Sequence, residues 1–377
     1  MKKYKLLYFV SEDHYFLTHK LPHALLALKN NFEVLIVCNT SKFKKKILAY
    51  GFNIKHIDLD RKSINPFQEL KTLIQLIRII SDFKPDVIQS VALKPIIYSS
   101  FCKIFFSKTI KLNVYSIVGL GYLFINKGFF NSFLKNLVET FLKLFLKKKK
   151  NIVVFQNNDD LSYFIKKKII EKEQSVLIPG SGVNTRYFTP MTNIKKKYDL
   201  IMHSRMLIDK GVYDLINAIK ILKRKEIKLT VLLLGSPDEK NRASIKKEYL
   251  KHLDKRKIIC WVPSKPNVLS YIQQSKIGIL PSYREGFPKS LLESASCGLP
   301  LISTNVAGCR EICIDGYNGF LSNVKDPHDL ARVIEKLLFD RKSQLLMGRN
   351  SRKFCIEKFS DFEISNQFLK IYNLIKI

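Results

Sequence analysis

Short apolar runs alternate with longer amphipathic runs along most of the 377-residue chain. The short runs are rich in Val, Ile and Leu, which is typical of buried parallel strands. The longer runs repeat their apolar residues with a helical period. This alternation predicts parallel sheets covered by helices on both faces, an α/β fold. The predicted strands are residues 4–10, 33–38, 54–57, 86–91, 112–118, 152–156, 199–203, 229–234, 257–260, 277–280 and 300–303, and the predicted helices are residues 20–30, 67–82, 130–147, 210–224, 266–275, 288–297 and 326–339.

The alternation occurs twice, which predicts two doubly wound, Rossmann-like domains. A Pro-Gly-Ser-Gly turn cluster at residues 179–182 and a polar stretch at 190–197 mark the join between them. We therefore place the first domain at residues 1–187 and the second at 188–356. The last segment, residues 357–377, has the apolar face of one more helix.

The most informative stretch is residues 281–319. Glu285 precedes a Gly-Phe-Pro turn, and Glu293 follows eight residues later inside an apolar helical run. Pro288 suits the first position of a helix, whose free N–H groups would then point back toward the turn and bind an anion. The two carboxylates could hold hydroxyl groups on either side of that anion. The spacing predicts a ligand with a sugar, a phosphate and a ribose in that order. The alternative is an ordinary helix start with a solvated Glu293.

A second stretch, residues 202–211, places Arg205 five residues before Lys210 in a strand-to-helix loop. Two fixed cations in such a loop can stabilise the negative charge that grows on a leaving diphosphate. Gly235 follows the apolar run 229–234 and suits a tight turn at the carboxyl end of a strand, where open α/β sheets bind ligands. The alternative for Arg205 and Lys210 is a solvated loop with a lysine cap.

These motifs resemble the nucleotide-sugar signature of retaining glycosyltransferases with the GT-B fold, family 4. Glu285 and Glu293 match the family's Glu-x7-Glu motif, whose first Glu contacts the donor sugar and whose second contacts the ribose. Gly-Leu-Pro at 298–300 and residues 315–319 also fit. The resemblance implies two Rossmann-like domains facing each other across a cleft, with the acceptor on the first, the donor on the second, and a tail helix crossing back to the first. It implies catalytic roles for Arg205, Lys210 and Glu285, and donor binding by Gly211, Gly235, Gly286, Phe287, Pro288, Lys289, Ser290, Leu291 and Glu293.

Residues 87–98, 113–128 and 65–67 carry a narrower resemblance. They are similar to transferases that add an N-acetylhexosamine to undecaprenyl-diphosphate-linked sugars in capsule, O-antigen and bacterial N-glycan synthesis. Many retaining GT-B enzymes carry a His beside the reacting carbon, whereas this chain has Leu-Lys-Pro at 93–95. The histidines and glycines among the acceptor candidates could equally lie in ordinary loops. The candidate acceptor-binding residues are His14, His19, Lys94, Gly119 and Gly121.

The chain is strongly basic, with 65 Lys and Arg against 32 Asp and Glu and a formal net charge of +33. Such a field favours anionic partners. Because no nucleic-acid-binding module is recognisable, we expect an anionic membrane surface and no nucleic acid. Residues 129–150 are amphipathic and bordered by lysines, which is typical of a helix lying on lipid. The alternative is a domain helix whose apolar stripe packs on the sheet.

Several classes of protein are disfavoured by the remaining features. No apolar run is long enough to span a bilayer, and residues 4–10 predict a buried strand rather than a signal peptide. The seven cysteines are scattered, which favours a reduced, cytosolic compartment. Because neither an Asp-x-Asp pair nor a metal-ligand spacing of His is present, we expect no metal and no other cofactor.

The combined prediction is a retaining, metal-independent glycosyltransferase at the inner face of a bacterial plasma membrane. It would move a sugar, an N-acetylhexosamine by the resemblance, from a UDP-sugar to a lipid-diphosphate-linked glycan. Two alternatives remain at this point. A GT-B nucleotide-sugar epimerase would share the fold, and a basic scaffold without activity would share the charge.

Overall fold

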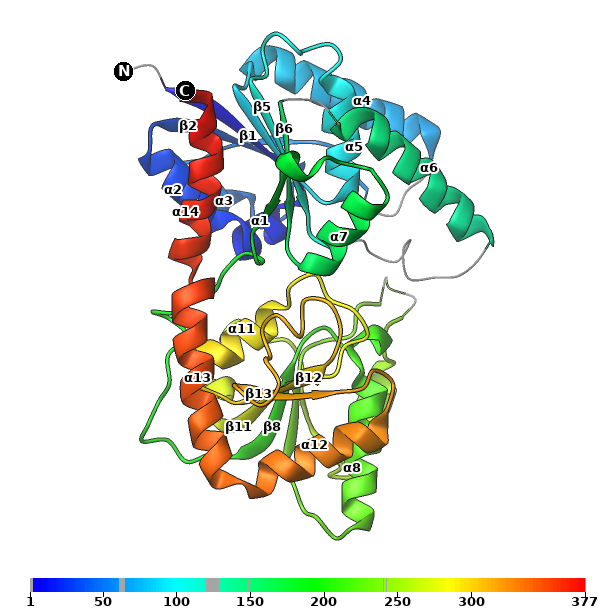
Figure 1. Cartoon of the computed structure of the whole chain (residues 1–377), viewed down its shortest axis with the longest axis vertical. Helices are drawn as coiled ribbons and strands as arrows, with labels where there is room; N and C mark the ends of the chain where they lie inside the picture. Colours follow the sequence, from blue (N-terminus) through cyan, green and yellow to red (C-terminus); the bar gives the residue numbers. More distant parts are fainter. Residues whose placement is uncertain are drawn as a thin grey trace. The chain divides into compact units, whose positions relative to one another are not determined.

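A computed structural model describes residues 3–60, 65–119, 129–147, 150–239, 241 and 243–376. It consists of two compact units, each built on its own parallel sheet (Figure 1). Unit 1 is Met1–Ser181 with Asp361–Ile377, and unit 2 is Gly182–Ser360. These divisions lie a few residues from the expected boundaries at 187 and 356. The reason is that Val183 donates its N–H to the Phe359 carbonyl at 2.9 Å, which ties both ends of unit 2 together.

Unit 1 is a seven-stranded sheet in the order β3-β2-β1-β4-β5-β6-β7, with every pair parallel. The strand order reverses between β1 and β4, which is the ligand-binding position of a doubly wound sheet. Its strands are β1 (Tyr4–Glu12), β2 (Phe32–Asn39), β3 (Asn53–His56), β4 (Val87–Val91), β5 (Leu112–Ile117), β6 (Asn151–Phe155) and β7 (Ser175–Leu177). Its α-helices are α1 (Asp13–His19), α2 (Leu21–Lys29), α3 (Lys44–Ala49), α4 (Pro66–Phe83), α5 (Leu93–Cys102), α6 (Phe129–Leu146), α7 (Asn158–Lys166) and α14 (Asp361–Tyr372).

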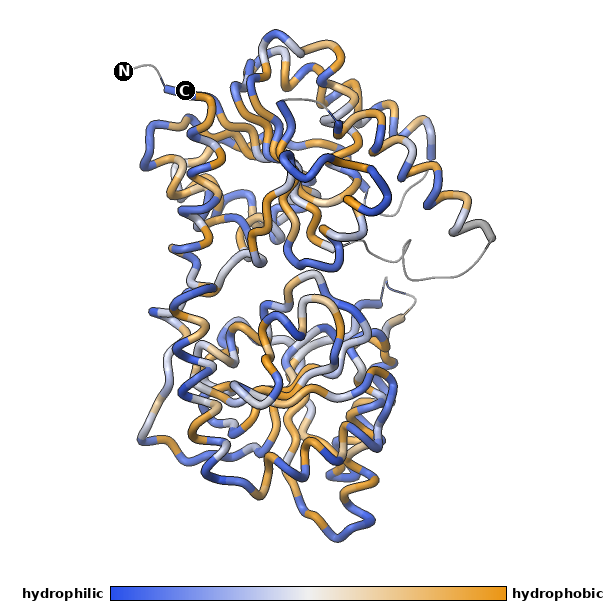
Figure 2. The backbone as a smooth tube through the Cα atoms, viewed as in Figure 1, coloured by the Kyte–Doolittle hydropathy of each residue, from blue (hydrophilic) through white to orange (hydrophobic). Residues whose placement is uncertain are grey.

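Helices cover both faces of this sheet because its central strands are apolar on both sides. The hydrophobic residues of these strands appear orange in Figure 2. In β1, Leu6, Tyr8 and Val10 pack in the core that includes α2 and α14. Leu7 and Phe9 point the other way, into the core that includes α4. All five side chains are fully buried. Successive strand residues therefore serve opposite layers.

The tail helix α14 is part of unit 1 and is joined to the sheet by a buried polar chain. The Tyr372 hydroxyl lies 2.7 Å from the Tyr8 hydroxyl and donates to Gln89 Oε1 at 3.1 Å. Gln89 Nε2 in turn donates to Ser116 Oγ at 2.8 Å. All four residues are buried, so the helix is held by hydrogen bonds that water cannot replace.

Unit 2 is a six-stranded parallel sheet in the order β10-β9-β8-β11-β12-β13. One apolar core runs through the unit, and the order reverses between β8 and β11. Its strands are β8 (Tyr198–His203), β9 (Val231–Leu234), β10 (Cys260–Val262), β11 (Ser275–Leu280), β12 (Leu301–Thr304) and β13 (Gly319–Ser322). Its α-helices are α8 (Val212–Arg224), α9 (Lys247–Lys255), α10 (Leu269–Gln273), α11 (Lys289–Ser296), α12 (Pro327–Phe339) and α13 (Arg341–Phe359).

Two short edge strands, β7 and β13, were not predicted, because each is only three or four residues long and exists through pairing with β6 or β12. The predicted strand 257–260 was placed too early, since β10 is Cys260–Val262 in register with β9. The predicted helix 266–275 is only Leu269–Gln273, because β11 begins at Ser275.

Helix α6 divides its apolar stripe between the core and the surface. Leu142 and Leu146 are fully buried under the helix. Phe133, Leu137 and Leu144 remain 63%, 57% and 67% exposed. The predicted segment is therefore a domain helix with a second apolar face turned outward. Across the described residues, no helix combines the length and apolar character needed to cross a bilayer.

We predict that Tyr372→Phe lowers the free energy of unfolding of unit 1 by about 1–3 kcal/mol, because Gln89 and Tyr8 lose a buried hydrogen-bond partner. Native-state hydrogen exchange of β1 and β4 amides measures this change without contribution from unit 2. Tyr50→Phe, at a 39% exposed tyrosine of the same unit, is the matched control and should change stability by less than ~0.5 kcal/mol. Equal exchange in both variants would contradict a stabilising role for the buried chain.

Candidate active site

The predicted donor residues of unit 2 gather at the carboxyl edge of its sheet. Strand β8 ends at His203. Arg205 lies in the loop that follows, and Lys210 is the last residue of a short 3₁₀ turn, Ile208–Lys210. The loop after the neighbouring strand β11 carries Glu285 and leads into α11, which carries Glu293. Because β8 and β11 are adjacent and parallel, both loops leave the sheet at the same edge. This edge is where open α/β sheets bind ligands.

Gly211 brings the two loops into backbone contact. Its φ is +75°, and a Cβ there would lie 1.9 Å from the Pro281 carbonyl oxygen. Two hydrogen bonds also join the loops: the Asp209 carbonyl accepts from the Tyr283 N–H at 2.8 Å and from Ser282 Oγ at 2.9 Å. Only glycine fits both the left-handed backbone and the space.

This contact brings Lys210 and Glu285 together. Lys210 Nζ lies 2.5 Å from Glu285 Oε1, and the two side chains are 16% and 11% exposed. The Cys309 thiol is buried close by, and its pKa is raised to about 12 by burial and, secondarily, by the Glu285 charge. The thiol is therefore neutral, and the charged groups of this corner are the amine and the carboxylate.

The second predicted carboxylate has a partner that was not predicted. Glu293 Oε2 lies 3.1 Å from His203 Nε2, with side chains 14% and 8% exposed. The sequence analysis did not include His203, because the residue ends an apolar strand. Its position as a polar residue at the carboxyl end of a central strand could have identified it as a candidate. Arg205 is more exposed and forms an ion pair with Asp238 at 3.1 Å. The structure thus joins Lys210 to Glu285 and leaves Arg205 with a different partner.

Gly235 makes another close backbone approach at the same edge. Its φ is +150°, and a Cβ would lie 1.8 Å from the Ser204 carbonyl oxygen. The Gly235 carbonyl accepts from Trp261 Nε1 at 2.9 Å. Trp261 also packs against the unit 2 core. The indole therefore supports the turn after β9.

The turn before α11 presents backbone rather than side chains. Pro288 is the residue before the helix, which begins at Lys289, one position later than predicted, because Pro288 has an extended ψ of 113°. Phe287 packs against the core and lies 5.2 Å from the Phe359 ring, and Leu291 is fully buried. Only the main chain of these two residues is suited to bind a ligand. Of the other predicted donor residues, Gly286 approaches the loop at Gly308, and Lys289 and Ser290 form the first turn of α11.

The predicted acceptor residues belong to unit 1. His14 and His19 do not lie in a loop, because helix α1 (Asp13–His19) begins directly after β1. His14 is exposed, with its ring 4.9 Å from that of Phe43. His19 stacks on Tyr15 at 4.4 Å. Lys94, at the start of α5, forms an ion pair with Glu69 at 2.8 Å and donates to the Asp60 carbonyl. Gly119 has a φ of +120°, and Gly121 lies outside the described residues.

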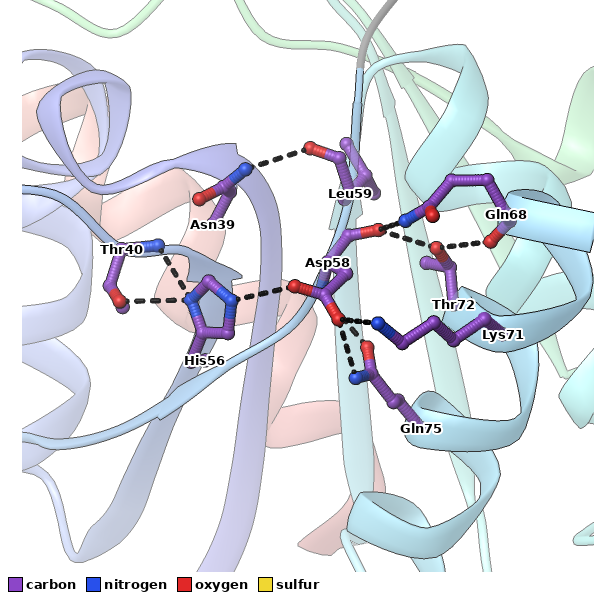
Figure 3. Close-up of polar contacts among 9 residues, drawn as sticks. All are labelled: Asn39, Thr40, His56, Asp58, Leu59, Gln68, Lys71, Thr72 and Gln75. Atoms are coloured by element: carbon purple, nitrogen blue, oxygen red, sulfur yellow. Dashed lines mark hydrogen bonds and ion pairs between the residues drawn. The ribbon is translucent and has the colours of Figure 1, made fainter. Parts of the chain in front are cut away.

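Figure 3 shows a polar network in unit 1 that joins the residues at the end of β3 to helix α4. The Asp58 carboxylate accepts from Lys71 at 2.8 Å, from Gln75 at 2.9 Å and from His56 Nε2 at 3.0 Å. The Thr40 N–H donates to His56 Nδ1, which leaves the ring proton on Nε2. Hydrogen bonds from Lys71, His56 and Gln75 hold the pKa of the Asp58 carboxyl well below its usual range. The network is satisfied internally and supports the loop rather than offering a free carboxylate.

Two other kinds of site have no counterpart in the part of the chain that the structure describes. Its His, Cys, Asp and Glu side chains form no group of three that could hold a metal ion. All seven cysteines are free thiols, so Cys309 and Cys313 are not bonded to each other.

Family models match both units. Residues 5–157 match the model described as glycosyl transferase 4-like, and residues 186–354 match glycosyl transferases group 1. One relative is an N,N'-diacetylbacillosaminyl-diphospho-undecaprenol alpha-1,3-N-acetylgalactosaminyltransferase of Campylobacter jejuni, 26% identical over 91% of each chain. Another is the capsular polysaccharide biosynthesis glycosyltransferase CapM of Staphylococcus aureus, 26% identical over 92% of this chain and 90% of the relative.

Solved glycosyltransferase structures share the fold of this chain. Anabaena HepE, solved in complex with UDP and glucose, superposes with a TM-score of 0.77 at 14% identity, over 98% of this chain and 99% of that one. The two family models together cover the unit 2 sheet with its charged corner, and the unit 1 sheet apart from β7 and the first residue of β1. The predicted fold and family are confirmed: the chain belongs to the GT-B glycosyltransferases of family 4.

Proposed function

We propose that this glycosyltransferase moves an N-acetylhexosamine from a UDP-sugar to a lipid-diphosphate-linked glycan, with retention at the anomeric carbon and without a metal ion. The observation that carries the proposal is the near-buried pair of Lys210 and Glu285 at the carboxyl edge of the unit 2 sheet. It places a cation, which can bind the diphosphate, beside a carboxylate, which can accept hydrogen bonds from sugar hydroxyls. A sugar-diphosphate donor requires both groups.

Each charged group has a distinct part in donor binding. Lys210 and Arg205 would bind the diphosphate, and the N-terminus of α11 would add its main-chain N–H groups. Glu285 would accept from hydroxyls of the donor sugar, and Glu293 from those of the ribose. Pro288, the residue before α11, has no side-chain group that could cap the helix. The order sugar, diphosphate, ribose follows the order Glu285, helix terminus, Glu293 along the chain.

Retention is proposed to proceed by attack on the same face that the diphosphate leaves. The acceptor hydroxyl would attack the anomeric carbon as the bond to the diphosphate breaks, and a β-phosphate oxygen would take the hydroxyl proton. Lys210 then stabilises the charge that develops on the leaving group. The protein contributes orientation and fixed positive charge, which are effective because the corner is nearly closed to water.

The lipid-linked acceptor is proposed from two independent observations. The relatives from Campylobacter jejuni and Staphylococcus aureus, which match almost the whole chain, are named for an undecaprenol-linked substrate and for capsular polysaccharide synthesis. In unit 1, Lys94 lies in the first turn of α5 after β4, and His14 and His19 lie in α1, which follows the adjacent strand β1. We assign them, with Gly119 and Gly121, to the acceptor.

A donor panel tests the proposal directly. Purified protein incubated with UDP- and GDP-sugars should hydrolyse a UDP-N-acetylhexosamine, with UDP raising the thermal midpoint. Transfer to a lipid-diphosphate-linked acceptor should give a product that keeps the donor's anomeric configuration by NMR. EDTA should change the initial rate by less than about twofold, since cations of the protein serve the diphosphate. Loss of activity on chelation, restored by Mg²⁺, would reject the metal-free mechanism, and an inverted product would reject retention.

We predict that Lys210→Ala lowers kcat by about a hundredfold or more, because one lost charge contact to the leaving group costs roughly 3 kcal/mol. Initial-rate kinetics at saturating donor measure the effect, and circular dichroism checks the fold. Lys276→Ala is the matched control. It breaks a lysine–carboxylate pair of the same unit, with Asp199 at 2.8 Å, at the opposite edge of the sheet. Normal turnover of a folded Lys210→Ala protein would remove the leaving-group role.

We further propose that unit 1 binds the anionic inner face of the plasma membrane. Helices α4 and α6 both contact α5 and lie on one side of the sheet (Figure 1). Both helices expose apolar side chains, and the turn after α5 exposes further apolar side chains. Exposed cations on the same segments complement anionic headgroups. The apolar side chains are Phe67, Leu70, Ile74, Ile104, Phe105, Phe133, Leu137 and Leu144, and the cations include Arg78, Lys108 and Lys143.

The structure describes only Lys147 and Lys150 of the predicted run Lys147 to Lys150. Lys147 forms an ion pair with Glu171 at 2.7 Å, and Lys148 and Lys149 lie outside the described residues. The membrane contact is therefore assigned chiefly to the exposed apolar side chains.

We predict that replacing Phe133, Leu137 and Leu144 together by Ser releases the protein from vesicles rich in phosphatidylglycerol, since about half or more of each side chain is exposed and free to enter lipid. Sedimentation with vesicles measures binding, which should also weaken as salt rises. Replacing the exposed Phe339, Leu345 and Leu346 of unit 2 is the control and should leave binding unchanged. Undiminished sedimentation of the α6 variant, or equal loss in the control, would reject this surface.

A further inference from the structure

His203, which is paired with Glu293, has no part in the chemistry proposed above. Glu293 belongs to α11 and His203 is the last residue of β8, 90 positions earlier. Their side chains are 14% and 8% exposed, and Nε2 lies 3.1 Å from Oε2. Two elements distant in sequence therefore meet through one polar contact that is nearly closed to solvent.

Such a carboxylate needs a donor. An ionised carboxylate withdrawn from water is destabilised unless hydrogen bonds replace its hydration. The imidazole supplies one such bond to Oε2. A carboxylate has about four lone-pair positions, so this bond leaves capacity for further donors. The Cys297 thiol, one helical turn further along α11, is kept neutral because burial raises its pKa to about 12, with the Glu293 charge adding to the effect.

We infer that His203 is a positioning residue for the nucleotide: its Nε2–H donates to Glu293 Oε2 and fixes the carboxylate so that the remaining lone pairs accept from the ribose hydroxyls. This inference rests on the proposed assignment of Glu293 to the ribose. It adds a residue on a different element from the Glu-x7-Glu motif. His203 itself does not touch the reacting carbon in this scheme.

The arrangement has a consequence for selectivity. A carboxylate that can swing between rotamers must be ordered when the ribose binds, which reduces affinity. A carboxylate already held by an imidazole on a rigid strand avoids that cost. The benefit applies only to ligands that carry the ribose hydroxyls. Loss of His203 should therefore weaken binding of UDP and leave binding of a nucleotide without these hydroxyls unchanged.

Calorimetric titration with UDP and with 2′,3′-dideoxyuridine diphosphate tests this. The wild-type protein should prefer UDP by about ten- to a hundredfold, the range for hydrogen bonds to a charged group. His203→Ala should reduce that preference to about threefold or less, with unchanged affinity for the dideoxy nucleotide. His203→Gln, whose amide can donate from a similar position, should restore most of it. His252→Ala, at an exposed histidine of the same unit, is the control.

The outcomes separate the inference from the function on which it rests. No UDP binding by the wild-type protein, or full ribose preference in Glu293→Gln, would overturn the assignment of Glu293 and the inference with it. Lost preference in Glu293→Gln but full preference in His203→Ala would overturn the role of His203 alone. Equal weakening of both nucleotides in His203→Ala and His203→Gln would show a purely structural role, which also rejects the inference.

Discussion

Backbone contact between loops at the carboxyl edge of the second sheet is the constraint on which the candidate site depends. Gly211 lies against Pro281, Gly235 against Ser204, and Gly308 has space only for a hydrogen beside the Gly286 carbonyl. A methyl group at any of the three would sit well inside contact distance of a carbonyl oxygen. Because the loops touch through main chain, side chains separated by many residues can form short polar contacts. The chemistry of the site follows from that approach.

The two polar pairs at this edge stabilise nearly buried carboxylates by giving each of them a partner. Lys210 neutralises Glu285, and His203 satisfies Glu293, so neither carboxylate is left buried without a partner. Each pair costs desolvation but fixes the direction of its groups, and fixed dipoles and charges are what transition-state stabilisation requires. The neighbouring thiols stay neutral because burial raises their pKa. The arrangement therefore favours binding and charge stabilisation over covalent catalysis by cysteine.

In unit 1, buried and half-buried polar contacts support the loops of the sheet, and two helices expose apolar side chains. The buried chain from Tyr372 to Ser116 joins the last helix to β5, whose carboxyl end leads toward Gly119. The network around Asp58 joins the chain that follows β3 to helix α4. These polar contacts hold the helices and the chain after β3 on the sheet. Helices α4 and α6 also carry apolar side chains that are exposed rather than packed in the core.

Much of this organisation was determined by the sequence alone. Alternating periodicity was enough to predict two parallel α/β sheets. The Glu-Gly-Phe-Pro turn and the Arg and Lys of the loop after β8, chosen from the sequence as the candidate site, do lie at one edge of a sheet. Periodicity reports that a face is apolar but not what covers it, so the division of α6 between core and surface could not be predicted. The partners of Glu285 and Glu293, 75 and 90 residues away, were likewise decided only by tertiary structure. They depend on the adjacency of β8 and β11 and on backbone approaches through glycine, which no local pattern encodes.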